Sequence, residues 1–369
     1  MLSREIASDI VEQTTIRLKR NINIMDETGV IIASANPERI NQIHYAAIEV
    51  LRTGKTIVID NKASSEWGNS LPGINLPIEF EQQIIGVIGI TGNPQSLLEF
   101  GELIKMNTEM MIKQAFMVEQ LEWKQRLKDL IFDHLKKNVI NPKQIQQRLE
   151  LLNLTLHAPY QVSIIQIHSE KILRGQTIEI LEQIFNHNKT LIGFLKGNQL
   201  YILNSSVSNE VIKQKMKEAI VLLDKKGLPA RVSMGTNVNS LDLIQLSYHE
   251  AVISLTLGNQ HQSLIEYAEV KTKALLNNVE KETKQLYYER ILGDLSDKWI
   301  DTLEHFFTCN LNIAECAKDM YIHRNSLIYR IKKIKEISGY DPQKFEDAIQ
   351  LQLAVWLKRM VEAPLHKKE

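Results

Sequence analysis

Residues 312–335 read NIAECAKDMYIHRNSLIYRIKKIK, and this stretch decides how the C-terminal part of the chain folds. Asn312 is a good N-cap for a first helix, and a short turn at Tyr321–His323 leads to a second helix from about Arg324. The apolar residues of both helices recur at the spacing of an inward face: Ile313, Cys316, Ala317 and Met320, then Leu327, Ile331 and Ile334. This spacing predicts a helix-turn-helix, whose second helix enters the major groove of DNA.

The boundaries of this motif also follow from local residues. Ser338-Gly339 ends the second helix, and Asp341-Pro342 begins the next one. Tyr321 stands in the turn, where many helix-turn-helix motifs have glycine. The alternative is an ordinary helical bundle with a solvated outer face.

The outward face of the second helix carries the residue types that bind DNA. Near its N-terminal end, arginine can contact guanine and asparagine can contact adenine, whereas basic side chains further along suit phosphates. The predicted DNA-binding residues are His323, Arg324, Asn325, Ser326, Tyr329, Arg330, Lys332 and Lys333, and Lys335 is a further phosphate candidate.

The charge of the chain supports this location. The 369 residues contain 44 Lys+Arg and 44 Asp+Glu, so the formal net charge is zero. Met320 to Lys335 holds five basic residues and no acidic one, which leaves the remainder at −5. Neutrality is therefore a cancellation and does not exclude DNA. We expect only the C-terminal domain to bind DNA, with an affinity that falls steeply with salt.

Outward from this motif, the pattern predicts a multidomain α+β chain. Residues 1–95 show a helix (2–20), a hairpin (22–33), a helix (38–53) and a second strand pair, which is typical of a small PAS-like sensory domain. Residues 96–141 read as a long helical connector that pairs with a second copy, or as two antiparallel helices. Strands and helices alternate over 142–265, residues 266–297 form a helical linker, and 298–369 are all α.

Several functional classes are excluded or disfavoured. No apolar run is long enough for a membrane helix, and charges near the N-terminus argue against a signal peptide, so we expect a cytoplasmic protein. The two cysteines, Cys309 and Cys316, are too few for a zinc site and read as core residues. No catalytic or metal-binding constellation is found, which predicts neither enzyme activity nor a cofactor. Gly86, Gly89 and Gly92 lie in a strand-like run, where close backbone approach or strand packing explains them.

Three stretches resemble known families in the order in which those families combine. IHRNSLIYRIKKI resembles the C-terminal helix-turn-helix domain of PucR-type regulators. NINIMDETGVIIAS, ERINQIHYAA and PGINLPIEFEQQIIGVIGITGNP resemble the sugar-diacid recognition domain of CdaR-type carbohydrate-diacid regulators. SMGTNVNSLDLIQLSYHEAVISLTLG resembles the degenerate GGDEF-like domain of the same regulators, without its signature motif, so cyclase activity is not implied.

The resemblance implies a small carboxylate effector such as glucarate, galactarate or glycerate. In the acidic N-terminal segment, Arg39 can clamp a carboxylate and His44 can donate a hydrogen bond, and the two lie five residues apart in a predicted helix. Pro72–Pro77 reads as a rigid loop that offers the backbone N–H groups of Gly73, Ile74 and Asn75. The alternative is that Arg39 pairs with Glu38 or Glu49 and that the loop only turns the chain.

The sequence therefore allows two functions. The first is a dimeric or higher-order transcription factor, most simply an activator, in which a hydroxy-acid biases the connector and so changes the DNA affinity of paired C-terminal domains. The second is an enzyme acting on sugar acids, with the C-terminal bundle as an oligomerisation module. The missing catalytic motifs and the IHRNSLIYRIKKI segment count against the second.

Overall fold

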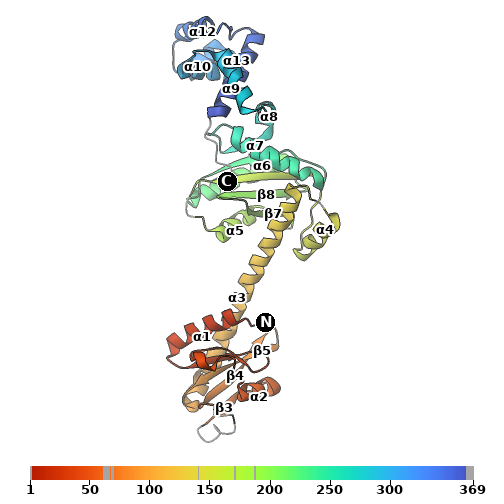
Figure 1. The fold of residues 1–369 in the computed structure, drawn as a ribbon, viewed down its shortest axis with the longest axis vertical. Helices are drawn as coiled ribbons and strands as arrows, with labels where there is room; N and C mark the ends of the chain where they lie inside the picture. The colour runs from red at the N-terminus through yellow and green to blue at the C-terminus, as the bar shows by residue number, and fades with distance from the viewer. Residues whose placement is uncertain are drawn as a thin grey trace. The chain divides into compact units, whose positions relative to one another are not determined.

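The computed structural model of the chain describes residues 2–60, 67, 70–139, 141–169, 172–186 and 188–362. Two β-sheets combine with many helices, so the predicted mixed α+β class is confirmed (Figure 1). The chain divides into two compact units, Met1–Arg126 and Leu127–Glu369. Helix α3 (Pro94–Lys136) is a single helix of 43 residues that contributes to both units, so the alternative of two antiparallel helices is wrong.

The first unit is built on a five-stranded antiparallel sheet with the strand order β2-β1-β5-β4-β3. Its elements are α1 (Arg4–Leu18), β1 (Ile22–Met25), β2 (Ile31–Ser34), η1 (Pro37–Arg39), α2 (Tyr45–Thr53), β3 (Ile57–Ile59), β4 (Gly73–Phe80), β5 (Gln83–Thr91) and the first part of α3. The predicted helix over 38–53 is wrong at its start. Asn41 takes a left-handed conformation (φ 68°) between the 3-10 turn η1 and helix α2, which interrupts the helix.

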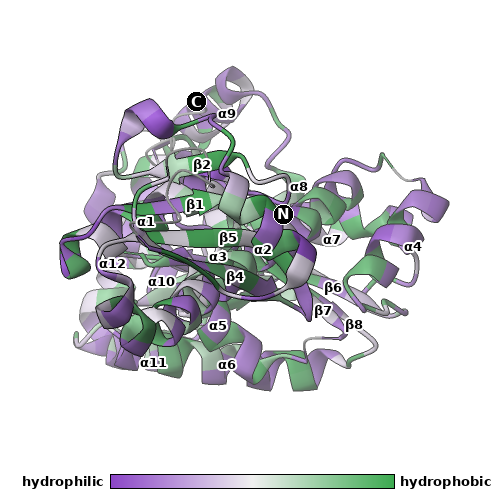
Figure 2. Cartoon of the chain, turned by 90° about the horizontal axis from the view of Figure 1, so that it is seen from below, coloured by the Kyte–Doolittle hydropathy of each residue, from purple (hydrophilic) through white to green (hydrophobic). Residues whose placement is uncertain are grey.

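Each face of this sheet has its own core. Ile74, Leu76 and Ile78 of β4 point toward α1 and α3, where they pack in one buried cluster. The alternate residues point the other way, and there Met25 and Val87 pack with Ala47 and Val50 of α2. This alternation is the two-residue period of a strand. In Figure 2, β4 and β5 are hydrophobic along most of their length, as expected for strands covered on both faces.

The second unit contains a second five-stranded sheet, with the order β10-β9-β6-β8-β7. Its elements are the end of α3, α4 (Pro142–Leu151), β6 (Tyr160–Ile167), α5 (Arg174–Ile184), β7 (Thr190–Phe194), β8 (Gln199–Ser205), α6 (Asn209–Lys225), β9 (Ala230–Met234), η2 (Leu241–Leu243), α7 (Ile244–Leu257) and β10 (Leu264–Glu266). Helices α5 and α6 cover one face, and α4, α7 and the end of α3 cover the other.

The end of α3 is firmly attached to this second sheet. The Phe132 ring stacks on Tyr201 of β8 with 3.7 Å between ring centroids, and the Tyr201 hydroxyl donates to Asp129 Oδ1 at 2.9 Å. Burial raises the pKa of Tyr201 well above its usual range, so the hydroxyl remains a donor. One helix thus belongs to the cores of both units.

The remaining helices complete the chain. They are α8 (Tyr267–Leu275), α9 (Lys281–Leu292), α10 (Asp297–Thr308), α11 (Ile313–Asp319), α12 (Arg324–Ser338) and α13 (Phe345–Glu362). Helix α9 packs on α13, and α10 contacts α11, α12 and α13, so the helices α9 to α13 enclose a core of their own. Within the described residues, no helix is long and apolar enough to cross a membrane.

Candidate functional site

The predicted helix-turn-helix is formed by α11 and α12. Leu327 and Ile331 of α12 pack with Cys316 and Ala317 of α11 and with Phe306 of α10. Cys309 and Cys316 are free and buried, which confirms them as core residues. The interior of the motif is therefore the one that the apolar spacing predicts.

Local hydrogen bonds set the ends of both helices. Asn312 caps α11, since its side chain accepts from the N–H groups of Ala314 and Glu315. His323 caps α12, because its ring Nδ1 accepts from the N–H of Asn325 at 3.2 Å. This capping role was not predicted. Gly339 ends α12 in the left-handed conformation, as expected.

The outer face of α12 is open. Asn325, Tyr329 and Lys332 lie four and three residues apart, so they form one stripe, and all three are exposed. Arg324 and Ser326 are also exposed at the first turn. These five residues are named the α12 outer face below. They combine side chains of the kinds that can contact bases, at the N-terminus of the helix, with the Lys332 ammonium about two turns further on.

The other predicted basic residues have partners within the domain. Arg330 is half-buried and donates to the buried Thr302 hydroxyl of α10 at 3.3 Å, so it is better placed to hold α12 on α10 than to reach DNA. Lys333 pairs with Glu336 at 2.5 Å, and Lys335 pairs with Asp341 at 2.8 Å. Such exposed pairs are weak and leave both lysines able to exchange partners.

A second candidate site lies in the first unit, where a polar row crosses the face of the sheet that α2 covers. Asn23 of β1, Gly89 of β5 and Asn75 of β4 are direct cross-strand partners. Both asparagines are nearly fully buried, and Asn23 Oδ1 accepts from the Ser34 hydroxyl at 2.7 Å. Asn75 Oδ1 has no hydrogen-bond partner among the described residues. Such a group is costly to bury unless something donates to it.

Gly89 makes room for this row. A Cβ atom at this position would lie 2.8 Å from Asn75 Oδ1, which is too close for any side chain to be added without movement. Gly86 is constrained by backbone instead, since its Cβ would lie 2.4 Å from the carbonyl oxygen of Met25. Close approach, as predicted, accounts for both glycines. Asn23 and Gly89 were not predicted as site residues, although the glycines within a strand-like run were the available signal.

Arg39 and His44 lie near the start of α2. His44 is the N-cap residue of α2, only 6% exposed, and its Nδ1 has no hydrogen-bond partner among the described residues. Burial, followed by the nearby charge of Arg39, lowers the pKa of His44 from 6.5 to about 4. At neutral pH the site therefore presents a neutral imidazole beside a guanidinium.

Arg39 has no carboxylate partner among the residues that the structure describes. It is half-buried, and this burial lowers its pKa. An arginine guanidinium is not deprotonated in proteins, so Arg39 carries a positive charge. Glu49, one of its two suggested partners, instead binds Arg52 through both carboxylate oxygens. The structure thus brings Arg39 and His44 together, although not on one helix as the spacing suggested.

The predicted loop over 72–77 is wrong. Gly73, Ile74 and Asn75 belong to β4, which is paired with β3 on one edge and β5 on the other. Strand pairing engages their backbone N–H groups, so these groups are not a ready anion site. Of the three residues, only Asn75 directs its side chain to the face that α2 covers. No described contact joins Asn75 to Arg39 or His44.

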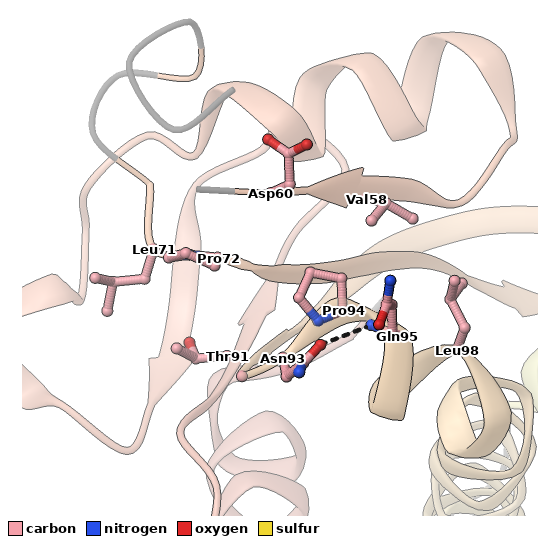
Figure 3. Close-up of a pocket in the computed structure, with 10 residues that line it drawn as sticks. Val58, Asp60, Leu71, Pro72, Thr91, Asn93, Pro94, Gln95 and Leu98 are labelled. Carbon is pink, nitrogen blue, oxygen red and sulfur yellow. Dashed lines mark hydrogen bonds between the residues drawn. The ribbon is translucent and has the colours of Figure 1, made fainter. Parts of the chain in front are cut away.

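A cavity of about 750 Å³ opens elsewhere in the first unit, beside the start of α3 (Figure 3). Its polar lining includes Asp60, Thr91, Asn93 and Gln95, and Asn93 Oδ1 accepts from the Gln95 N–H at 3.0 Å. Among the described lining residues, Asp60 is the one acidic side chain and none is basic. Arg39, by contrast, gives the Arg39–His44 site a guanidinium that can bind a carboxylate.

Comparisons with known proteins agree with this arrangement of domains. Residues 2–135 match the family described as putative sugar diacid recognition, and residues 137–257 match the GGDEF-like domain. Residues 299–357 match the PucR C-terminal helix-turn-helix domain. The resemblance inferred from the sequence is confirmed.

The chain is also similar to regulators along its length. It is 28% identical over 378 residues to the carbohydrate diacid regulator of Escherichia coli (strain K12), covering 96% of this chain and 98% of that protein. It is 24% identical over 264 residues to the proline-responsive transcriptional activator PutR of Bacillus subtilis (strain 168), covering 64% and 63%. It is 24% identical over 229 residues to the DNA-binding transcriptional activator AdeR of the same organism, covering 57% and 54%.

These relatives and the matched C-terminal domain support a DNA-binding regulator of transcription. The prediction that the chain is not an enzyme is confirmed by the same comparisons. Among the described residues, no group of three or more His, Cys, Asp or Glu side chains could hold a metal ion.

Proposed function

From the sugar-diacid recognition and PucR-type helix-turn-helix domains of this chain, we propose that it is an effector-responsive transcription factor, and specifically an activator. A small carboxylate such as glucarate, galactarate or glycerate binds a PAS-like first domain and controls genes for the catabolism of sugar diacids or glycerate. The E. coli relative, a carbohydrate diacid regulator, supports this effector class.

The single observation that carries DNA binding is the α12 outer face. Arg324 and Asn325 at the start of α12 are exposed and carry no described intramolecular side-chain bond. Arginine can donate to the N7 and O6 acceptors of guanine, and asparagine can pair with the N7 acceptor and N6 donor of adenine. Lys332, about two turns further on, is suited to a phosphate. Arg330 is assigned to packing instead, because its guanidinium donates to Thr302.

The carboxylate site is centred on Arg39 and His44. An effector carboxylate supplies the counter-charge that Arg39 lacks among the described residues, and a hydroxyl can bond the unpartnered Nδ1 of His44. Asn75, with its buried unpartnered oxygen, is suited to donation from a further hydroxyl of the same effector. Gly73 and Ile74 have no place in this proposal, because their N–H groups belong to the sheet.

Dimerisation is assigned to α3. Leu103, Met106, Met110, Met117 and Leu121 are exposed large apolar side chains on this helix. Spacings of three, four and seven place the first four at positions a, d, a and a of a heptad repeat, and Leu121 lies on the same face, one residue after the d position of Gln120. We assign a second copy of α3 as the partner of this apolar face. The two DNA-binding domains of such a dimer would bind two half-sites about 34 Å apart, which is one helical turn of DNA.

The experiment that tests this function uses the full chain. Calorimetric titration with glucarate, galactarate and D-glycerate identifies the effector, and selection from a random duplex library yields a DNA probe. We expect one of the acids to bind and to change the affinity for the selected duplex. Failure to select any duplex, together with turnover of a sugar acid, would favour the enzyme alternative.

A further inference from the structure

Tyr321 occupies the backbone position at which helix α11 ends. Its N–H bonds the carbonyl of Lys318 at 3.1 Å, and the N–H of Ile322 bonds the carbonyl of Ala317 at 2.9 Å. These two bonds form a Schellman motif, in which the residue after the helix is left-handed and is usually glycine. Tyr321 has φ +52°, so a tyrosine tolerates a conformation that glycine would adopt without a Cβ clash.

Within the described residues, the tyrosine side chain makes no packing contact or hydrogen bond that would offset the cost of this conformation. It is 96% exposed, whereas Ile322, the next residue, packs into the core of the motif. No hydrogen bond or ring contact of the Tyr321 side chain is found within the described part of the chain. A strained residue whose side chain serves no internal packing points to a role outside the folded chain.

The surroundings of Tyr321 indicate what that role is. Two residues later His323 caps α12, and Arg324, Asn325 and Ser326 of the α12 outer face follow directly. From Met320 to Lys335 there are five basic residues and no acidic one, so the stretch attracts a polyanion. A phenol hydroxyl is a neutral donor of the kind that bonds phosphate oxygens.

We propose that Tyr321 is a DNA-backbone contact whose hydroxyl donates to a phosphate at the edge of the groove that α12 enters. The contact positions α12 so that Arg324 and Asn325 meet the bases. This inference rests on the proposed DNA-binding function and adds a residue to it. Because the phenol is neutral, the contact contributes affinity without releasing a counter-ion.

Two substitutions separate the contact from the backbone strain. Tyr321→Phe keeps the ring and removes the hydroxyl, and we expect it to weaken binding of the selected duplex about three- to tenfold. Tyr321→Gly removes the side chain and relieves the left-handed strain. It should weaken binding at least as much, while hydrogen–deuterium exchange in α11 and α12 becomes slower. For both variants, we expect the salt slope of the affinity to stay at the wild-type value.

Asn310→Gly is the matched control. Asn310 is also exposed and left-handed (φ +52°), and it lies at the end of helix α10. Its N–H donates to the carbonyl of Phe307, and the N–H of Leu311 donates to the carbonyl of Phe306. It should change exchange rates without changing DNA affinity. Wild-type affinity in Tyr321→Phe would overturn the hydroxyl contact while leaving DNA binding intact. A wild-type chain that binds no duplex would instead refute the proposed function itself.

Discussion

Gly101 of α3 lies directly against Ile74 of β4: a Cβ atom at position 101 would come within 2.7 Å of Ile74 Cδ1. Further along the same pair of elements, Lys105 binds Glu79 at 2.6 Å, and the rings of Phe80 and Phe116 meet edge to face at 5.1 Å. Strand β4 therefore lies along α3 over most of the length of the strand. It also carries Asn75 on its opposite face, so it is the element best placed to couple an effector to the helix.

We expect Gly101→Leu to disconnect effector binding from DNA binding. A Cβ at position 101 would lie 2.7 Å from Ile74 Cδ1 and 3.4 Å from Leu76 Cδ2, and a leucine adds three further carbons against these two buried side chains, so we expect α3 to move away from β4. The effector should still bind in calorimetry, whereas its effect on duplex affinity, of the order of 5- to 150-fold in coupled systems, should fall close to one. Glu119→Leu, at an exposed position of the same helix away from the apolar stripe, is the control. Full coupling in Gly101→Leu would contradict a role for this contact.

Arg39→Ala should abolish carboxylate binding. The guanidinium is the charge that the effector neutralises, and an alanine leaves no replacement. Loss of a charge-assisted bond of this kind weakens binding by about 10- to 100-fold or more, which calorimetry of the full chain measures. Arg52→Ala is the matched control, because Arg52 is exposed and already bound to Glu49. An Arg39→Ala chain that binds as tightly as the control would remove Arg39 from the site.

His44 makes the stability of the first unit depend on pH. Its pKa is about 4 in the folded chain against 6.5 normally, so below pH 6.5 the unfolded state takes up a proton that the folded state does not. The contribution of His44 to the free energy of unfolding is fully present above pH 6.5 and is lost between pH 6.5 and pH 4. It amounts to at most roughly 3 kcal/mol and is reduced by whatever solvent reaches the ring.

Thermal melts at pH 7.5, 6, 5 and 4.5 test this effect. The difference in Tm between the wild type and His44→Gln should change in favour of the glutamine variant as the pH falls. Subtracting one chain from the other removes the common titration of Asp and Glu side chains. A difference that stays constant across the window would mean that His44 titrates normally in the folded chain.

Met110→Lys should dissociate the assembly. The substitution places a charge in the middle of the apolar stripe on α3, where two such lysines would face one another in a parallel pair. Light scattering coupled to gel filtration should give a mass near that of one 42.4 kDa chain, and a larger mass for the wild type. Glu119→Lys places a lysine at an exposed position on the opposite face of α3 and should leave the mass unchanged. A monomeric wild type would refute the stripe as an interface.

The sequence predicts the parts of this protein that depend on periodic patterns. Leu327, Ile331 and Ile334 are buried as their spacing indicates, and the long helix extends over 94–136. Single residues that interrupt a pattern are harder to foresee. The left-handed Asn41 breaks the expected helix, and because β4 is paired on both edges, the apparent loop at Gly73 is a strand.

The proposed effector site follows least completely from the sequence, for a physical reason. Arg39 and His44 are near neighbours along the chain, so local spacing brings them into consideration. Asn23 and Asn75 lie in the same row only because β5 separates β1 from β4, which is a matter of strand order. A single sequence contains no direct record of strand order.

The two-sided character of β4 has a consequence for how such regulators diversify. In the proposed mechanism Asn75 meets the effector, whereas Ile74 and Leu76, its neighbours on β4, pack toward α3, so each set can be substituted without replacing the other. A change at Asn75 should then alter which acid is recognised, while Ile74 and Leu76 keep their contact with Gly101. The same separation offers a route to engineered biosensors, in which the recognised metabolite is changed and the genetic output is retained.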